Sequence, residues 1–152
     1  MRALRHLVAI VVLPGTVTVL IPALLLDDTA LAPWPLAALG AVLLAAGVGT
    51  IGWTVSLFAG VGKGTLAPWD PPRRLVVRGP YRHVRNPMIS GVLTVLLGEA
   101  ALFGSVAVLI WAGVVFSINA VYFVAVEEPD LRQRFGAEYD AYAARVPRWI
   151  PR

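Results

Sequence analysis

Polar and charged side chains gather where a long loop passes into an apolar segment. The loop ends in the run Arg78-Gly-Pro-Tyr-Arg-His-Val-Arg-Asn-Pro-Met, in which Asn86 and Pro87 predict the N-cap and first turn of a helix. A helix N-terminus exposes main-chain N–H groups and the positive end of the helix dipole. With Arg82 and Arg85 beside it, this turn is predicted to bind an anionic group of a ligand.

A pair of carboxylates stands at the end of the last apolar segment. Glu127 and Glu128 are followed by Pro129, and we expect the helix to end there. Acidic residues at a helix C-terminus oppose the helix dipole, so the pair favours a functional role. The alternative interpretation is that the two carboxylates balance Arg82 and Arg85 at the membrane surface.

Apolar segments must position these two groups. The chain has 152 residues, of which 58% are hydrophobic and 14% are charged. Its mean hydropathy of +0.74 is too high for a soluble domain. Segments 7–26, 35–60, 87–103 and 105–126 each have the length that crosses a bilayer. The sequence therefore predicts an all-α membrane protein with four transmembrane helices.

The third and fourth segments are separated only by Gly104 and Ser105, which predicts a tight helical hairpin. Residues equidistant from the turn of a hairpin lie at the same depth. Asn119 is therefore expected near Ser90, and the carboxylate pair near the Asn86 turn. The hairpin brings the two groups together on one polar face.

The distribution of basic residues predicts the orientation. All thirteen lysines and arginines lie before the first span, between the second and third, or after the fourth. The positive-inside rule places both termini and the long loop in the cytoplasm. This distribution argues against nucleic acid as a partner. Cysteine is absent, which excludes disulfides and Cys-ligated zinc.

The loop of residues 61–86 is dense in glycine and proline, which predicts a backbone folded closely around a ligand. A plain connector is the alternative, and the absence of Walker spacing argues against a nucleotide triphosphate. Beyond Pro129, helical spacing predicts one amphipathic helix lying on the membrane surface. Its apolar residues are Leu131, Phe135, Tyr139, Tyr142 and Val146.

Three pieces of the sequence together resemble the isoprenylcysteine carboxyl methyltransferase family. They are Gly79-Pro-Tyr-Arg-His-Val-Arg-Asn-Pro-Met, the Glu127-Glu128 pair, and Phe135-Gly-Ala-Glu-Tyr-Asp-Ala-Tyr with Arg145-Val-Pro. Phospholipid N-methyltransferases share a weaker version. The resemblance covers residues 63–151, whereas segments 7–26 and 35–60 match only as hydrophobic spans.

The resemblance implies one integral membrane methyltransferase domain over residues 1–152, with two spans in 1–60 and a cofactor-binding core in 61–152. It implies methyl transfer from S-adenosyl-L-methionine to a lipophilic acceptor at the cytoplasmic face, without a metal. By position, cofactor contacts fall on Arg74, Leu75, Val76, Tyr81, Asn86, Pro87, Met88, Ile89 and Glu127. Substrate contacts fall on Tyr122 and Phe123. Candidates for a catalytic role are Asn119, Arg85 and Arg145.

The chain departs from the family pattern at three positions. Asn86 and Ile89 stand where the family commonly has His and Tyr, and Phe123 replaces a basic residue thought to meet the substrate carboxylate. The acceptor therefore stays open between a prenylated cysteine and a lipid, and between a carboxylate, an amine and a thiol. Two other functions stay open as well: a non-catalytic transporter subunit or scaffold, and an NADPH-dependent membrane reductase. Glu99, near mid-membrane, is a structural or functional carboxylate.

Overall fold

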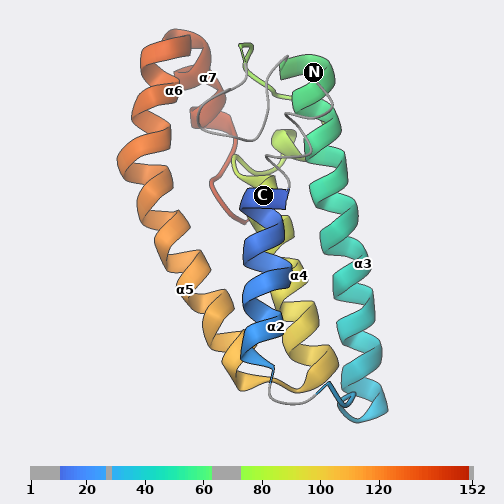
Figure 1. The fold of residues 1–152 in the computed structure, drawn as a ribbon. Helices are drawn as coiled ribbons and strands as arrows, with labels where there is room; N and C mark the ends of the chain where they lie inside the picture. The colour runs from blue at the N-terminus through green and yellow to red at the C-terminus, as the bar shows by residue number, and fades with distance from the viewer. Residues whose placement is uncertain (1–10, 27–28, 63–72, 151–152) are drawn as a thin grey trace.

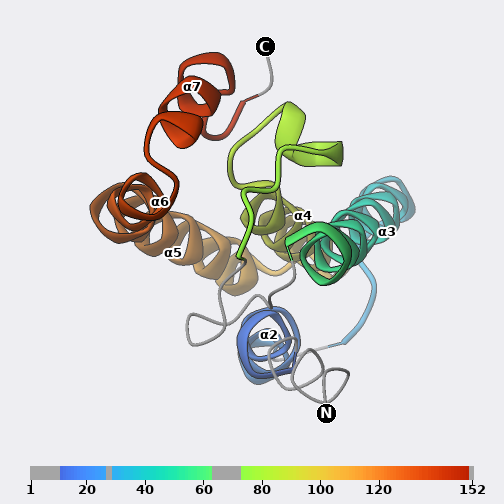
Figure 2. The ribbon, with the colours of Figure 1, turned by 90° about the horizontal axis from the view of Figure 1, so that it is seen from above.

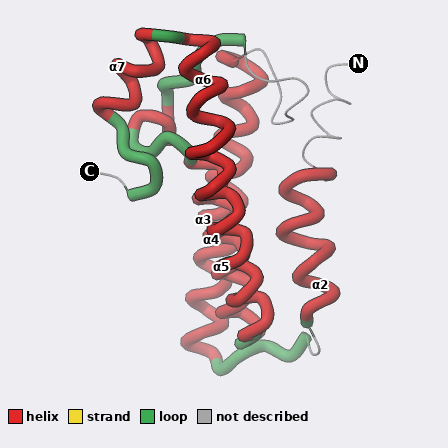
Figure 3. Tube along the Cα trace, turned by 90° about the vertical axis from the view of Figure 1, so that its left-hand side faces the viewer, coloured by secondary structure: helices red, strands yellow, loops and turns green. Residues whose placement is uncertain are grey.

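The computed structural model describes residues 11–26, 29–62 and 73–150. Within these ranges the chain forms helices and loops and no strand (Figure 3). Two helices are long and apolar enough to cross a membrane, Trp34–Gly62 and Val106–Phe135, and Pro14–Leu25 and Pro87–Phe103 are shorter apolar helices. The all-helical prediction is confirmed for the described residues, and the count of four spans stays a prediction.

The long helices run side by side, and the short C-terminal helices cover one end of them (Figure 1). The π-helix η1 (Val11–Leu20) passes into α2 (Ile21–Leu25), and α3 (Trp34–Leu57) passes into the π-helix η2 (Phe58–Gly62). Viewed from above, α4 (Pro87–Phe103) lies between α3 and α5 (Val106–Tyr122) (Figure 2). The central helix thus begins at the end where the C-terminal helices lie.

Glycines bring α3 and α4 into close contact. A Cβ atom added to Gly47 of α3 would lie 2.7 Å from the main-chain nitrogen of Val95 and 2.8 Å from the carbonyl oxygen of Gly91. One added to Gly98 of α4 would lie 2.8 Å from the nitrogen of Leu44. Small residues permit such close backbone approach between apolar helices. The fixed position of α4 against α3 in turn fixes the turn at the start of α4.

The start of α4 and the turn into α5 are defined by local hydrogen bonds. The side chain of Asn86 accepts a hydrogen bond of 3.4 Å from the main-chain nitrogen of Ile89, which confirms the predicted N-cap. Gly104 ends α4 with a φ of +63°, a conformation that favours glycine. Ser105 then accepts a 3.3 Å hydrogen bond from the nitrogen of Val108 and caps α5. Buried residues of both helices form the core between them.

The helix does not end at Pro129, so the predicted end of the last apolar helix is wrong. After α5 the chain continues through the π-helix η4 (Phe123–Glu127) into α6 (Glu128–Phe135). The nitrogen of Glu128 donates to the carbonyl of Phe123, five residues earlier, and Pro129 occupies the first turn of α6, where a proline is tolerated. Glu127 therefore lies inside a continuous helix, and the argument from the helix dipole does not apply to it.

The predicted single amphipathic helix is divided in two. The chain turns at Gly136, which has a φ of +51°, and α7 (Ala137–Arg145) follows. The side chains expected on one apolar face still form one cluster, because the turn folds α7 back beside α6. Its members are Tyr139, Tyr142 and Val146, with Leu75, Leu131 and Phe135 packed against them.

Candidate functional site

A cavity of about 650 Å³ lies where η3 (Gly79–Arg82), the start of α4, η4 and the C-terminal helices meet. Most residues with a predicted role line this cavity. They are Arg74, Leu75, Val76, Tyr81, Arg85, Asn86, Met88, Ile89, Asn119, Tyr122, Phe123 and Glu127. Two predicted residues do not line it: Pro87 is buried in the first turn of α4, and Arg145 lines a second cavity. The structure thus brings twelve of these residues together, and their roles stay predictions.

Tyr81 is held at the cavity by contacts from two other elements. The hydroxyl of Tyr142 in α7 donates a 2.7 Å hydrogen bond to the carbonyl oxygen of Tyr81. The ring of Phe58 in η2 lies 5.5 Å from the ring of Tyr81, between centroids. Burial raises the pKa of Tyr81, and the nearby charge of Glu127 raises this pKa further. The side chain therefore stays a neutral hydroxyl.

Among the described residues, no cation forms an ion pair with the carboxylate of Glu127. The side chain lies in η4, is half-buried, and lines the cavity. Within the described ranges, no ion pair or hydrogen bond joins this carboxylate, and its charged neighbours Glu128 and Asp130 are also acidic. A partly buried negative charge without a partner favours binding of a cationic group.

Glu128 has the opposite environment, although it is the next residue. It is buried, and it accepts hydrogen bonds of 2.8 Å from Nη1 of Arg85 and of 2.7 Å from Nε of Arg148. The guanidinium of Arg132 lies 3.7 Å from its second oxygen. The expectation that the acidic pair balances Arg82 and Arg85 is therefore right only for Glu128 and Arg85, since Arg82 is exposed and forms no ion pair with described residues.

Two of the three catalytic candidates, Asn119 and Arg85, line this cavity, and hydrogen bonds join both to neighbouring groups. The side-chain nitrogen of Asn119 donates to the carbonyl of Val115 at 2.8 Å. Arg85 is bound at its side chain by Glu128, and its main-chain nitrogen donates to the carbonyl of Pro147 at 2.9 Å. These bonds fix the position of each side chain against the cavity wall.

The cavity continues from this polar end into the apolar part of the helix bundle. Pro14 and Val17 of η1, together with Val92 and Val115, line the deeper part. Sequence reasoning missed η1, because nothing in a uniformly apolar segment indicates which helix it packs against. The arrangement offers a polar region beside an apolar one, and it suits a charged ligand next to a lipophilic one.

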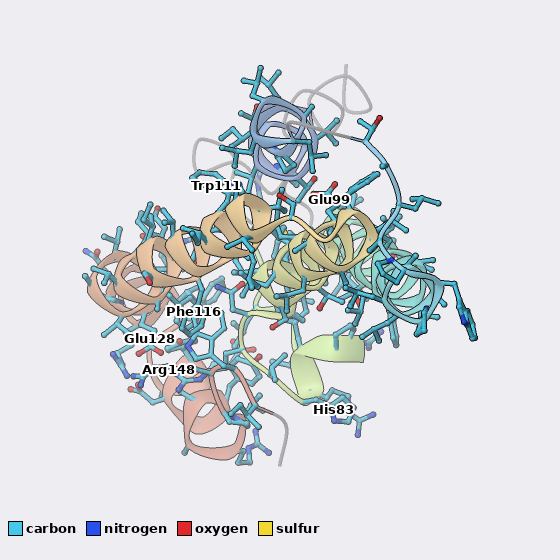
Figure 4. All side chains as sticks on the ribbon, turned by 90° about the horizontal axis from the view of Figure 1, so that it is seen from below. His83, Glu99, Trp111, Phe116, Glu128 and Arg148 are labelled. Atoms are coloured by element: carbon cyan, nitrogen blue, oxygen red, sulfur yellow. The ribbon has the colours of Figure 1, made fainter. Side chains whose placement is uncertain are left out.

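Glu99 and His83 lie apart from the cavity. One carboxylate oxygen of Glu99 is buried without a hydrogen-bond partner in the described structure. Figure 4 shows Glu99 and Trp111 on the side of α2, away from Glu128 and Arg148, and shows His83 at the outer surface. Trp111 donates from Nε1 to the carbonyl of Val17 at 3.0 Å, which ties α5 to η1.

Two comparisons with known proteins bear on this site. The model of the phospholipid methyltransferase family matches residues 36–138, about two thirds of the chain. The matched region includes α3, α4, α5 and η4, and so contains most of the cavity wall. No curated protein matches the chain.

Proposed function

The chain belongs to the phospholipid methyltransferase family, and from this premise we propose that it transfers a methyl group from S-adenosyl-L-methionine to a lipophilic acceptor. The observation that carries the proposal is the carboxylate of Glu127, which pairs with no described residue and lies on a cavity that also has an apolar part. A polar wall for the cofactor and an apolar wall for the acceptor are what this reaction requires.

The residues present fit the cofactor. Glu127 would pair with its ammonium group or accept hydrogen bonds from its ribose hydroxyls. The helix N-terminus at Asn86 and the guanidinium of Arg74 would bind its carboxylate. Leu75 and Val76, with Met88 and Ile89, supply apolar contacts for its adenine ring. When bound, the cofactor supplies an activated methyl group on a sulfonium.

The protein's own contribution is alignment and exclusion of water. Val92, Val115 and Val17 would hold the acceptor's apolar chain, so that its reacting atom lies beside the polar end of the cavity. Tyr122 and Phe123 lie between these two regions along the helix and would contact the acceptor. A carboxylate acceptor needs no general base, whereas an amine would need one.

We also propose the arrangement in the membrane. The helices Trp34–Gly62 and Val106–Phe135 span the membrane. The shorter apolar helices Pro14–Leu25 and Pro87–Phe103 form two further spans. The positive-inside distribution of the basic residues supports a cytoplasmic position for both termini and for the polar end of the cavity. The acceptor then reaches the cavity laterally from the membrane.

Calorimetric titration of the detergent-purified protein with S-adenosyl-L-methionine tests the proposal, with NADPH as the control ligand. We expect saturable binding of the first and none of the second. In Glu127→Gln the loss of a charge-assisted contact should weaken binding by roughly 1.5 to 3 kcal/mol, or about ten- to a hundred-fold. Binding of NADPH alone would favour the reductase, and binding of neither would favour a non-catalytic membrane protein.

The matched control is Arg82→Gln. The sequence predicted Arg82 beside an anion site, but in the structure this arginine is exposed and lines neither cavity. The variant should leave the affinity for S-adenosyl-L-methionine unchanged. If both variants bind S-adenosyl-L-methionine as tightly as the parent protein, Glu127 does not hold the cofactor, and the assigned site is wrong.

A further inference from the structure

A second cavity, of about 590 Å³, shares Arg85 with the first. Residues 143–150, here called the C-terminal segment, form most of its wall. Arg85 lines both cavities. The proposed methyl transfer uses none of the residues of the C-terminal segment.

Arginine side chains give this second cavity unused hydrogen-bond donors. The side chain of Arg85 is only 9% exposed, and its Nε atom is buried without a hydrogen-bond partner among the described residues. Among the described residues, Arg145 donates a hydrogen bond only from Nε, to the carbonyl of Ala141, and Arg145 is exposed. Arg148 uses Nε and Nη2 on Glu128. An oxygen-rich anion in this cavity would satisfy the donors that remain.

The charges around the second cavity do not balance. Glu128 pairs with Arg85, Arg132 and Arg148, and Asp140 pairs with Arg132 as well. Arg145 lines the cavity and forms no ion pair with a described residue. Three arginines, Arg85, Arg145 and Arg148, thus line the cavity and no described acidic residue lines it, so the excess of positive charge favours an anion.

The C-terminal segment lies against the apolar surface of the long helix. The ring of Trp149 is 5.5 Å from that of Phe116 and 5.8 Å from that of Phe123, between centroids. Figure 4 shows Phe116, Glu128 and Arg148 together on this side of the molecule. Ile150 is 78% exposed. An exposed isoleucine and a tryptophan next to arginines are typical of a segment at the boundary of headgroups and acyl chains.

We propose that the second cavity binds the phosphate of an anionic phospholipid, whose acyl chains lie along Trp149 and Ile150. The phosphate oxygens accept hydrogen bonds from Arg85 and Arg145, and from Nη1 of Arg148, which bonds no described residue. The proposal rests on the membrane association of the chain but not on methyl transfer. It makes Arg85 a residue shared by a lipid site and the proposed cofactor site.

Quenching of tryptophan fluorescence by brominated lipids tests this site. The protein, without cofactor, is reconstituted in phosphatidylcholine nanodiscs. One set of nanodiscs contains brominated phosphatidylglycerol and the other contains brominated phosphatidylcholine, and both lipids carry the bromine on the acyl chains near the headgroup. We expect brominated phosphatidylglycerol to quench more strongly at equal mole fraction. Trp149→Phe should remove this difference, which assigns it to the C-terminal segment. Equal quenching by the two lipids in the parent protein would overturn the proposal.

Arg145→Gln tests the charge directly. Loss of one positive charge near the surface should lower the preference for phosphatidylglycerol about fivefold. The control Arg82→Gln, an exposed arginine outside the cavity, should keep the preference of the parent protein. Equal losses in the two variants would indicate a general surface charge and no site. If inorganic phosphate abolishes the quenching difference while an equal ionic strength of chloride does not, the cavity is a site for free phosphate, and the lipid assignment is wrong.

Discussion

The hydroxyl of Tyr142 donates a hydrogen bond of 2.7 Å to the main-chain carbonyl of Tyr81, and so joins α7 to the loop before α4 across 61 residues of sequence. Both residues are buried. In Tyr142→Phe the carbonyl of Tyr81 loses this partner in a buried position. We expect the free energy of unfolding to fall by about 1 to 3 kcal/mol, measured by thermal melts in detergent.

The same variant should weaken binding of S-adenosyl-L-methionine, because Tyr81 lines the proposed cofactor site. Tyr122→Phe is the control for stability, since the Tyr122 side chain is 45% exposed and its hydroxyl forms no hydrogen bond in the described structure. A Tyr142→Phe protein that melts like Tyr122→Phe would show that the bond across the fold contributes no stability.

Glu128 is predicted to be the most sensitive charged residue for stability. Glu128→Gln would leave the guanidinium of Arg85, which is only 9% exposed, without its carboxylate partner. Removing one partner of a buried ion pair costs roughly 3 to 5 kcal/mol of folding free energy. Asp130→Asn removes an exposed carboxylate that pairs with Arg134, and should cost about 0 to 1 kcal/mol. Equal melting temperatures for the two variants would contradict the buried network.

Two glycines of α3 give a matched test of the contact between α3 and α4. Gly47→Ala places a Cβ atom 2.7 Å from a main-chain nitrogen of α4, so the helices must move apart. This overpacking should cost about 1 to 3 kcal/mol. Gly49→Ala meets open space and should be neutral or stabilise the helix by roughly 0.5 to 1 kcal/mol. Thermal melts of the two variants test this prediction. A melting temperature for Gly47→Ala at or above that of Gly49→Ala would refute the close approach of α3 and α4.

The buried hydroxyl of Tyr81 predicts a loss of stability at high pH. Burial raises the pKa of Tyr81 above its ordinary value of about 10. The neutral hydroxyl is favoured in the folded protein, so this contribution is complete below pH 10 and is lost as the pH rises through the folded-state pKa. Melting temperatures between pH 8 and pH 11 should fall less steeply in Tyr81→Phe than in Tyr122→Phe. Parallel curves would show that Tyr81 titrates as in the unfolded chain.

Features that depend on neighbouring residues were predictable from the sequence. The N-cap at Asn86 requires only that residue, Pro87 and a following apolar helix, and the structure has it. The grouping of Asn86, Tyr81 and Glu127 on one cavity follows from two helices joined by Gly104 and Ser105. Such arguments use only helix geometry and chain connectivity, and these act over short distances.

Features that depend on tertiary packing were not predictable. Pro129 was expected to end a helix, but the preceding π turn bonds the nitrogen of Glu128 to a carbonyl five residues back, and the helix continues. Arg148 was not recognised as the partner of Glu128, because twenty residues and two changes of direction separate them. No local signal shows that Trp149 folds back against α5.

The π-helix η4 has a consequence for comparing this chain with others. A π turn holds one more residue than an α-helical turn and is equivalent to a single-residue insertion in a continuous helix. Deleting one residue from 123–126 would remove this extra residue and restore regular α-helical winding, while the residues after it keep the faces they present. Glu127 would still line the cavity, and Glu128 would still meet its arginine partners. Relatives with a regular helix here should align with a one-residue gap just before the acidic pair.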